Sequence, residues 1–169
     1  MKDLIENGFK HFLLDLDDDW KNLATKKSYS ELEQKLMDDL RLNLPIKKLV
    51  SQVYSSLKIE GAPVIEHMLA LRAGPEDPEL DGIWHDDSSR HFAISLSLSL
   101  EHTLIEGGEL EIRRFNQEED VTSLPGSRPF AQASVFLTGK YGFEHRTRRV
   151  TAGNRLVLVL WVSQSEASE

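Results

Sequence analysis

The sequence predicts an α+β domain in which N-terminal helices are followed by a run of β-strands. Apolar residues recur with a helical period over roughly the first 60 residues, and from His91 onward the period changes to two. The length of 169 residues suits one domain. Strands at this spacing usually close into a sandwich or barrel. We therefore expect supporting helices over 1–60, a β core over 61–163 and a tail over 164–169.

Two amphipathic helices are expected within the N-terminal third. Ser30 and Glu33 form a capping-box pattern at the start of the first helix. Pro45 suits the first turn of the second helix, which should end near Gly61. The apolar residues of the first helix follow at every fourth position: Leu32, Leu36 and Leu40.

The rest of the chain predicts strands and surface loops. Residues 62–84 indicate a strand and then a long loop, because several Pro and Gly lie among acidic residues there. In FAISLSLSL, residues 92–100, apolar side chains alternate with small polar ones. The last strand is apolar on both faces, so we expect the helices to cover its outer side. Further strands are expected over 109–115, 131–138, 144–150 and 155–162, with a loop over 116–129 and a turn over 151–154.

The absence of cysteine excludes disulfides, thiolate zinc sites, iron–sulfur clusters and cysteine nucleophiles. Any metal must therefore be held by His and carboxylate side chains. The longest apolar run is the seven residues of 156–162, and the first ten residues lack an apolar core after their charge. We expect no membrane span, no secretion signal and a soluble cytoplasmic protein.

The net charge of −8 is unevenly distributed. Residues 61–139 hold 14 acidic and 5 basic residues, which argues against nucleic acid as a partner. The acidic segment 76–81 predicts a preference for a basic peptide or a cationic small molecule. The C-terminal stretch is basic instead, with Lys140, Arg146, Arg148, Arg149 and Arg155.

One group of residues has the pattern of a non-haem iron site, in which two His and one carboxylate bind one face of the metal. His85 and Asp87 are two residues apart and project to the same side of an extended chain. His145 lies near the start of a predicted strand. Arg155 follows ten residues later, across a Gly turn, where a deep guanidinium suits a bidentate grip on a carboxylate.

Taken in order, these motifs resemble the 2-oxoglutarate- and Fe(II)-dependent dioxygenase superfamily, on its prolyl-4-hydroxylase-like side. The family pattern runs H-x-D, a strand, G-G-E-L, a strand, and H-x4-V-T-x-G-x-R before an apolar strand that ends in Trp. The matching residues lie between about 68 and 162: His85, Asp87, Gly107, Gly108, Glu109, Leu110, His145, Val150, Thr151, Gly153, Arg155 and Trp161.

The resemblance implies a double-stranded β-helix, or jelly-roll, core braced by the N-terminal helices. It implies that His85, Asp87 and His145 are the catalytic ligands of Fe(II), and that Arg155 pairs with the C5 carboxylate of 2-oxoglutarate. With O2 as oxidant, the implied reaction hydroxylates a C–H bond of a peptidyl side chain or a small molecule and yields succinate and CO2. It also admits ascorbate as an additional cofactor.

The sequence departs from the family pattern in two places and leaves alternatives open. Residues 69–74 lack the Tyr that often gives 2-oxoglutarate a second contact, and Arg149 replaces a common Pro. A non-catalytic, cupin-like binding module is the alternative function. Repair of alkylated nucleic acid is disfavoured by the net charge, by the Gly-Gly-Glu-Leu element and by the lack of further Arg after Arg155. The oligomeric state stays open.

Several other polar residues are expected to be structural. The acidic run from Asp15 to Asp19 lacks the Gly and distal Glu of a calcium loop. Arg146 and Arg148 should face away from the metal. The resemblance implies that loops 73–84 and 116–129 surround the mouth of the site, and Trp84 either lines this mouth or packs against other residues. The remaining His residues are expected at the surface or in hydrogen bonds: His11, His67, His91 and His102.

Overall fold

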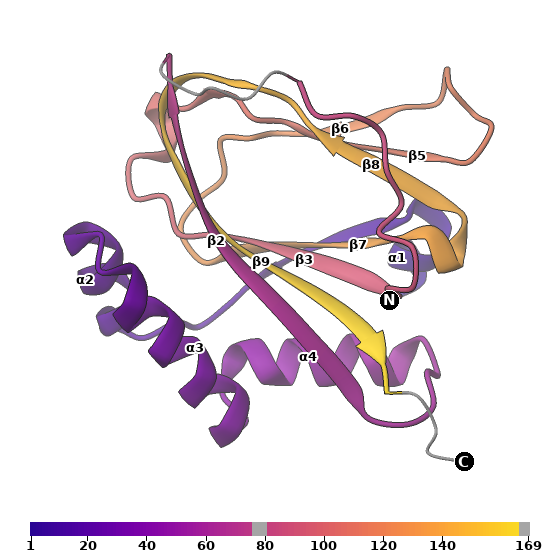
Figure 1. The fold of residues 1–169 in the computed structure, drawn as a ribbon, viewed down its shortest axis with the longest axis horizontal. Helices are drawn as coiled ribbons and strands as arrows, with labels where there is room; N and C mark the ends of the chain where they lie inside the picture. The colour runs from indigo at the N-terminus through magenta and orange to yellow at the C-terminus, as the bar shows by residue number, and fades with distance from the viewer. Residues whose placement is uncertain (76–80, 166–169) are drawn as a thin grey trace.

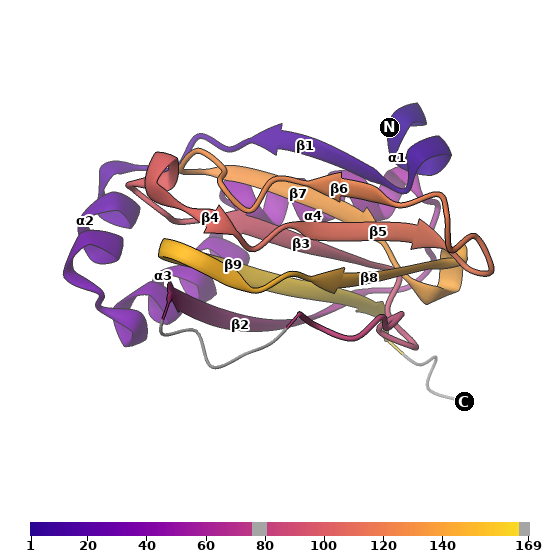
Figure 2. The ribbon, with the colours of Figure 1, turned by 90° about the horizontal axis from the view of Figure 1, so that it is seen from above.

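Two antiparallel β-sheets lie across from each other in the computed structural model, which describes residues 1–75 and 81–165 (Figure 1). The larger sheet has the strand order β1-β7-β3-β9-β2, with β4 paired to β9, and the smaller sheet has the order β6-β5-β8. Seen from above, the smaller sheet lies over the larger one (Figure 2). The strands are β1 (Phe9–Leu13), β2 (Pro63–Gly74), β3 (Phe92–Ser97), β4 (Glu106–Gly107), β5 (Leu110–Arg114), β6 (Thr122–Leu124), β7 (Gln132–Leu137), β8 (Phe143–Thr147) and β9 (Val150–Gln164).

The helices precede most of the strands, which confirms the predicted α+β class. Their bounds are α1 (Lys2–Asn7), α2 (Asp18–Lys26), α3 (Tyr29–Leu42) and α4 (Pro45–Ser56). Pro45 begins α4, as predicted. The carboxylate of Asp39 in α3 accepts hydrogen bonds from the backbone N–H groups of Lys47 (2.9 Å) and Ile46 (3.4 Å), so α3 caps α4. No helix among the described residues is long and apolar enough to cross a membrane.

The long strand β9 separates the hydrophobic core from the space between the sheets. Its even-numbered residues from 156 to 162 are at most 6% exposed and share one core with residues of α3 and α4, which lie beneath the larger sheet (Figure 1). Its odd-numbered residues line a cavity between the sheets: Arg155, Val157, Val159 and Trp161. The prediction that helices cover the outer face of this strand is therefore confirmed.

The predicted turn over residues 151–154 is wrong, because β9 continues through it. Gly153 pairs with Gly74 at the end of β2, and Glu106 of β4 pairs with the residue before Gly153. The φ angle of Gly153 is 73°, a conformation that glycine adopts without steric cost. The segment is therefore a bend within one strand that pairs with two others.

Three other local predictions are wrong, and tertiary contacts explain them. The expectation that residues 1–60 are helical fails at β1, which pairs with β7 along its length. The expected loop over 116–129 contains β6, which pairs with β5. Strands this short depend on their partners and give little periodic signal of their own. The capping box at Ser30 is also wrong, because α3 begins at Tyr29 with Ser28 as its N-cap.

Parts of two predictions fall outside the described residues. Of the acidic segment 76–81, only Asp81 is described. Its carboxylate pairs with the Arg148 guanidinium at 3.1 Å and accepts a hydrogen bond from the backbone N–H of Arg149 at 2.9 Å. Most of the expected tail lies beyond the described residues as well, since residues 166–169 are not among them.

Candidate metal centre

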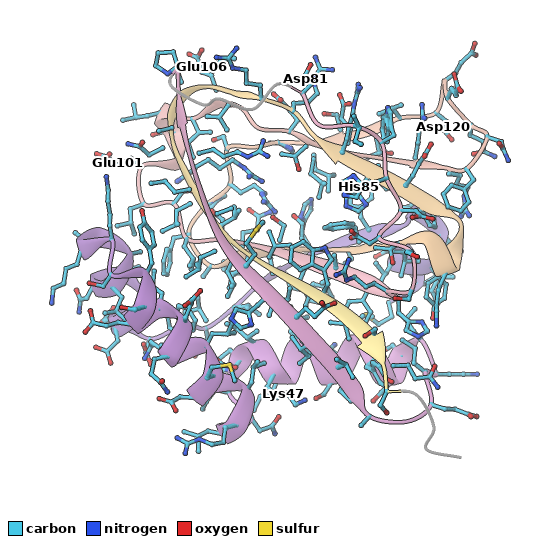
Figure 3. The ribbon with its side chains drawn as sticks, in the orientation of Figure 1. Lys47, Asp81, His85, Glu101, Glu106 and Asp120 are labelled. Atoms are coloured by element: carbon cyan, nitrogen blue, oxygen red, sulfur yellow. The ribbon has the colours of Figure 1, made fainter. Side chains whose placement is uncertain are left out.

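His85 and His145 lie side by side because the chain before β3 pairs with β8. The backbone N–H of His85 donates to the carbonyl of His145 at 3.0 Å, and the N–H of His145 donates to the carbonyl of His85 at 2.8 Å. Such reciprocal bonds define an antiparallel pair whose side chains share one face. The two ring centroids are 4.3 Å apart. Figure 3 shows His85 between the two sheets.

Asp87 completes a three-residue group. Its Oδ1 lies 3.7 Å from Nε2 of His85, and its Oδ2 lies 3.5 Å from Nε2 of His145. One ligand atom from each residue falls within 4.8 Å of the others, which suits a single ion held on one face by two His and a carboxylate. The structure thus brings the three predicted ligands together.

The backbone around Asp87 is not the extended chain that the sequence suggests. Its φ angle is 58°, so a left-handed conformation turns its carboxylate toward the two His rings. The preceding Asp86 holds this turn, because its carboxylate accepts a hydrogen bond from the N–H of Ser88 at 2.9 Å and its carbonyl accepts one from Gly139 at 2.8 Å. A strained backbone at a ligand position is typical of a site that its surroundings hold in place.

Hydrogen bonding and burial keep both His rings in the form that binds a metal. Nδ1 of His85 lies 3.0 Å from the carbonyl of Ile83, which can only accept, so Nδ1 carries the proton and Nε2 is left as a ligand. Burial, followed by the nearby charge of His85, lowers the pKa of His145 to about 3. The His145 ring is therefore neutral at physiological pH.

The environment of Asp87 fits a bound cation. Burial raises the pKa of its carboxyl group, against the opposing charges of His85 and Arg90 and a hydrogen bond from the Trp161 side chain. Its Oδ2 is buried and accepts no hydrogen bond from the described residues. A buried carboxylate oxygen without a hydrogen bond is costly, and a divalent ion between Asp87 and the ring nitrogens of His85 and His145 would compensate that cost.

A cavity of about 170 Å³ leads away from the two His rings between the sheets. Arg155 lines it and is only 4% exposed. A Cβ added at Gly108 would lie 2.8 Å from Cδ of Arg155, so the second glycine of the Gly-Gly pair leaves room for this side chain. The other described lining residues are Met68, Ala70, Arg72, Ser95, Leu110, Phe136, Thr147, Val157, Val159 and Trp161.

Two residues near the centre are not found by sequence reasoning. Arg90 approaches Asp87 at 3.6 Å, pairs with Glu66 at 2.9 Å and lies over the ring of Trp161. Arg72 lines the same cavity as Arg155. Only the register of β2 against β9 could have identified Arg72, because its position in the sequence carries no motif.

The polar residues expected to be structural behave as predicted where they are described. Arg146 and Arg148 pair with acidic residues, at 2.6 Å to Glu111 and 3.1 Å to Asp81. The ring of Trp84 packs against two guanidinium groups, and its centroid lies 4.1 Å from Cζ of Arg113 and 4.8 Å from Cζ of Arg146. In the acidic run, Asp17 caps α2 and pairs with Lys35.

Solved structures, but no sequence family, match this chain. No family model matches the chain, and no curated protein matches its sequence. The structure is similar to that of a prolyl-4-hydroxylase from Pseudomonas putida, with 19% identity, a TM-score of 0.67 and coverage of 97% of this chain and 92% of that one.

Two further solved structures extend the likeness. A prolyl hydroxylase from Trichoplax adhaerens, in complex with a hypoxia inducible factor peptide fragment, has 16% identity, a TM-score of 0.58 and coverage of 96% of this chain and 86% of that one. The non-heme alpha-ketoglutarate-dependent carbocyclase SnoK from nogalamycin biosynthesis has 10% identity, a TM-score of 0.66 and coverage of 99% and 85%. The chain therefore has the double-stranded β-helix fold of the prolyl-4-hydroxylases and other 2-oxoglutarate–Fe(II) oxygenases, as the sequence motifs predict.

Proposed function

We propose that the protein is an Fe(II)- and 2-oxoglutarate-dependent dioxygenase that hydroxylates a C–H bond of a peptidyl side chain or a small molecule. The observation that carries the proposal is the group of His85, Asp87 and His145, whose two His side chains line the same cavity as Arg155. The fold of the chain, which it shares with oxygenases of this type, supports the same function.

Each residue of the site has a distinct task in the proposed reaction. His85, Asp87 and His145 would hold Fe(II) with two ring nitrogens and one carboxylate oxygen. Arg155 binds the distal carboxylate of 2-oxoglutarate with its planar guanidinium. When bound, Fe(II), O2 and 2-oxoglutarate supply the oxidising power that inserts oxygen into a C–H bond, with succinate and CO2 as co-products. Apolar lining residues such as Phe136 and Val159 limit the entry of water.

The exposure of the ligands indicates the side from which the substrate approaches. The side chain of His85 is 49% exposed, whereas those of Asp87 and His145 are 7% and 6% exposed. Ile83, two residues before His85, is 82% exposed, which is unusual for a large apolar side chain. We place the substrate at this end, over His85 and Ile83.

The test is the formation of succinate from 2-oxoglutarate in the presence of Fe(II) and O2, measured over a panel of peptides and amino acids. We expect succinate with the wild-type chain and only background with His145→Ala, whereas His102→Ala, which removes a His outside the centre, should behave as wild type. Metal binding without succinate for any substrate would instead favour the cupin-like binding module.

A further inference from the structure

A second arginine enters the cavity beside Arg155. In the antiparallel pair of β2 and β9, Arg72 is the register partner of Arg155. Directly opposed residues of such a pair have their side chains on the same face, with Cβ atoms about 4.5–5.5 Å apart. Both residues line the cavity between the sheets. Two guanidinium groups therefore approach one small space from neighbouring strands.

The juxtaposed charges favour an anionic ligand. Both guanidinium groups belong to residues that line one cavity, so each can donate hydrogen bonds to an anion bound there. A guanidinium presents a planar fork of donors that matches the two oxygens of a carboxylate. The cavity, at about 170 Å³, limits the ligand to a small molecule.

The other lining residues indicate the chemistry of the rest of that ligand. The ring of His145 packs against Phe136, whose strand pairs through Ala93 with Trp161, and Trp161 lies six residues along β9 from Arg155. The His rings and the arginine pair therefore lie toward different ends of β9. The lining of the cavity is mostly apolar, with hydroxyl groups from Ser95 and Thr147. A molecule that fits has one anionic group at the arginines, a short aliphatic middle and metal-binding oxygens at the His residues. A five-carbon 2-oxo dicarboxylate has this chemistry.

We infer that Arg72 binds the distal carboxylate of 2-oxoglutarate together with Arg155, and that the pair selects dicarboxylates over 2-oxo monocarboxylates. The inference rests on the proposed function. It also supplies the second co-substrate contact for which the sequence offers no Tyr in residues 69–74.

Three other arginines nearby hold the surrounding chain in place. Arg128 is 2% exposed, and its guanidinium donates to the carbonyl and hydroxyl oxygens of Ser95 and to the hydroxyl of Ser134. Arg149 donates to the carbonyl of Pro75. Arg148 pairs with Asp81, so it offers a matched control for the loss of one arginine near the site.

The experiment measures binding rather than turnover. Calorimetric titration of Mn(II)-loaded protein without oxygen gives the Kd of 2-oxoglutarate and of 2-oxopentanoate, which has the same carbon chain without the distal carboxylate. We expect Arg72→Ala to raise the Kd of 2-oxoglutarate by about 10- to 100-fold, the usual loss for a hydrogen bond to a charged group. The Kd of 2-oxopentanoate should not change, and Arg148→Ala should match wild type for both ligands.

Arg72→Lys keeps the charge but lacks the planar fork of donors, so its Kd for 2-oxoglutarate should lie between those of wild type and Arg72→Ala. Unchanged 2-oxopentanoate binding also shows that Arg72→Ala is folded. Equal 2-oxoglutarate affinity in Arg72→Ala and wild type, with binding lost in Arg155→Ala, would overturn the inference and leave the proposed function intact. If Mn(II)-loaded wild type binds no 2-oxoglutarate at all, the proposed function itself fails, and the inference with it.

Discussion

His145 is the candidate ligand whose protonation the fold controls most strongly. It lies on β8 with a side chain that is 6% exposed, and its ring packs against that of Phe136 with centroids 4.7 Å apart. The apolar surroundings disfavour the charged ring, which is why its pKa falls to about 3. The same burial that protects the ligand form makes the apoprotein sensitive to acid.

This burial predicts a loss of stability on acidification. The folded-state pKa of His145, about 3, is below the ordinary value of 6.5, so the contribution of the neutral ring is complete above pH 6.5 and is lost as pH falls. Between pH 6.5 and 4.5 the free energy of unfolding should fall by about 2–3 kcal/mol from this group alone. Urea unfolding of metal-free wild type and His145→Gln at both pH values measures it. Equal pH dependence in the two proteins would contradict the assignment.

The sequence predicts the identities of the metal ligands but not their backbone conformations. His85, Asp87 and His145 follow from a pattern of residue types, and they do meet in space. The left-handed backbone of Asp87 depends on Asp86 and its bond to Gly139, a contact between distant parts of the chain. Arg72 is missed for a related reason, because only strand pairing sets it opposite Arg155.

The element that carries His85 and Asp87 is a short segment outside the regular strands. Its bridge to β8 is reinforced by Trp84, whose ring packs against the guanidinium groups of Arg113 and Arg146. Arg113 and Arg146 are in turn fixed by carboxylates of β8 and β5, each at 2.6 Å. The segment is thus held at the edge of the smaller sheet beside β8, and its His85 side chain lines the cavity.

This packing predicts that Trp84 positions the metal ligands without contacting the ion. Trp84→Ala should weaken binding of Mn(II) by about 10- to 100-fold, as is usual when the support of a ligand is removed. Trp84→Phe keeps an aromatic face for both arginines and should restore most of the affinity. Competition titration with a metal chelator measures all three proteins. Wild-type affinity in Trp84→Ala would show that Trp84 only packs.

Strands and helices whose apolar residues recur with a clear period are predicted well, and those without such a period are not. The alternation in residues 92–100 identifies β3, and the spacing of apolar residues identifies α4. β1 and β6 have five and three residues, and they exist because neighbouring strands offer free edges. The bend at Gly153 resembles a turn in the sequence because glycine suits both.

Over the whole molecule, the fold separates stability from chemistry. The helices cover one face of the larger sheet and form most of the core there, while the other face, together with the smaller sheet, encloses the cavity (Figure 1). Because side chains alternate along β9, its even-numbered residues from 156 to 162 face the core and its odd-numbered residues face the cavity. Substitutions on its core face should therefore act mainly through stability, and those on the cavity face through ligand binding.

The proposed function requires the three metal ligands and the cavity lined by Arg155 to bind Fe(II) and 2-oxoglutarate together. Anaerobic titration of the protein with Fe(II) and then 2-oxoglutarate detects this complex through its visible metal-to-ligand charge-transfer band. We expect one Fe(II) per chain, a band that appears only with 2-oxoglutarate, and loss of both metal and band in His85→Ala. No band in the wild-type protein, together with an unchanged metal content in His85→Ala, would contradict the proposed function.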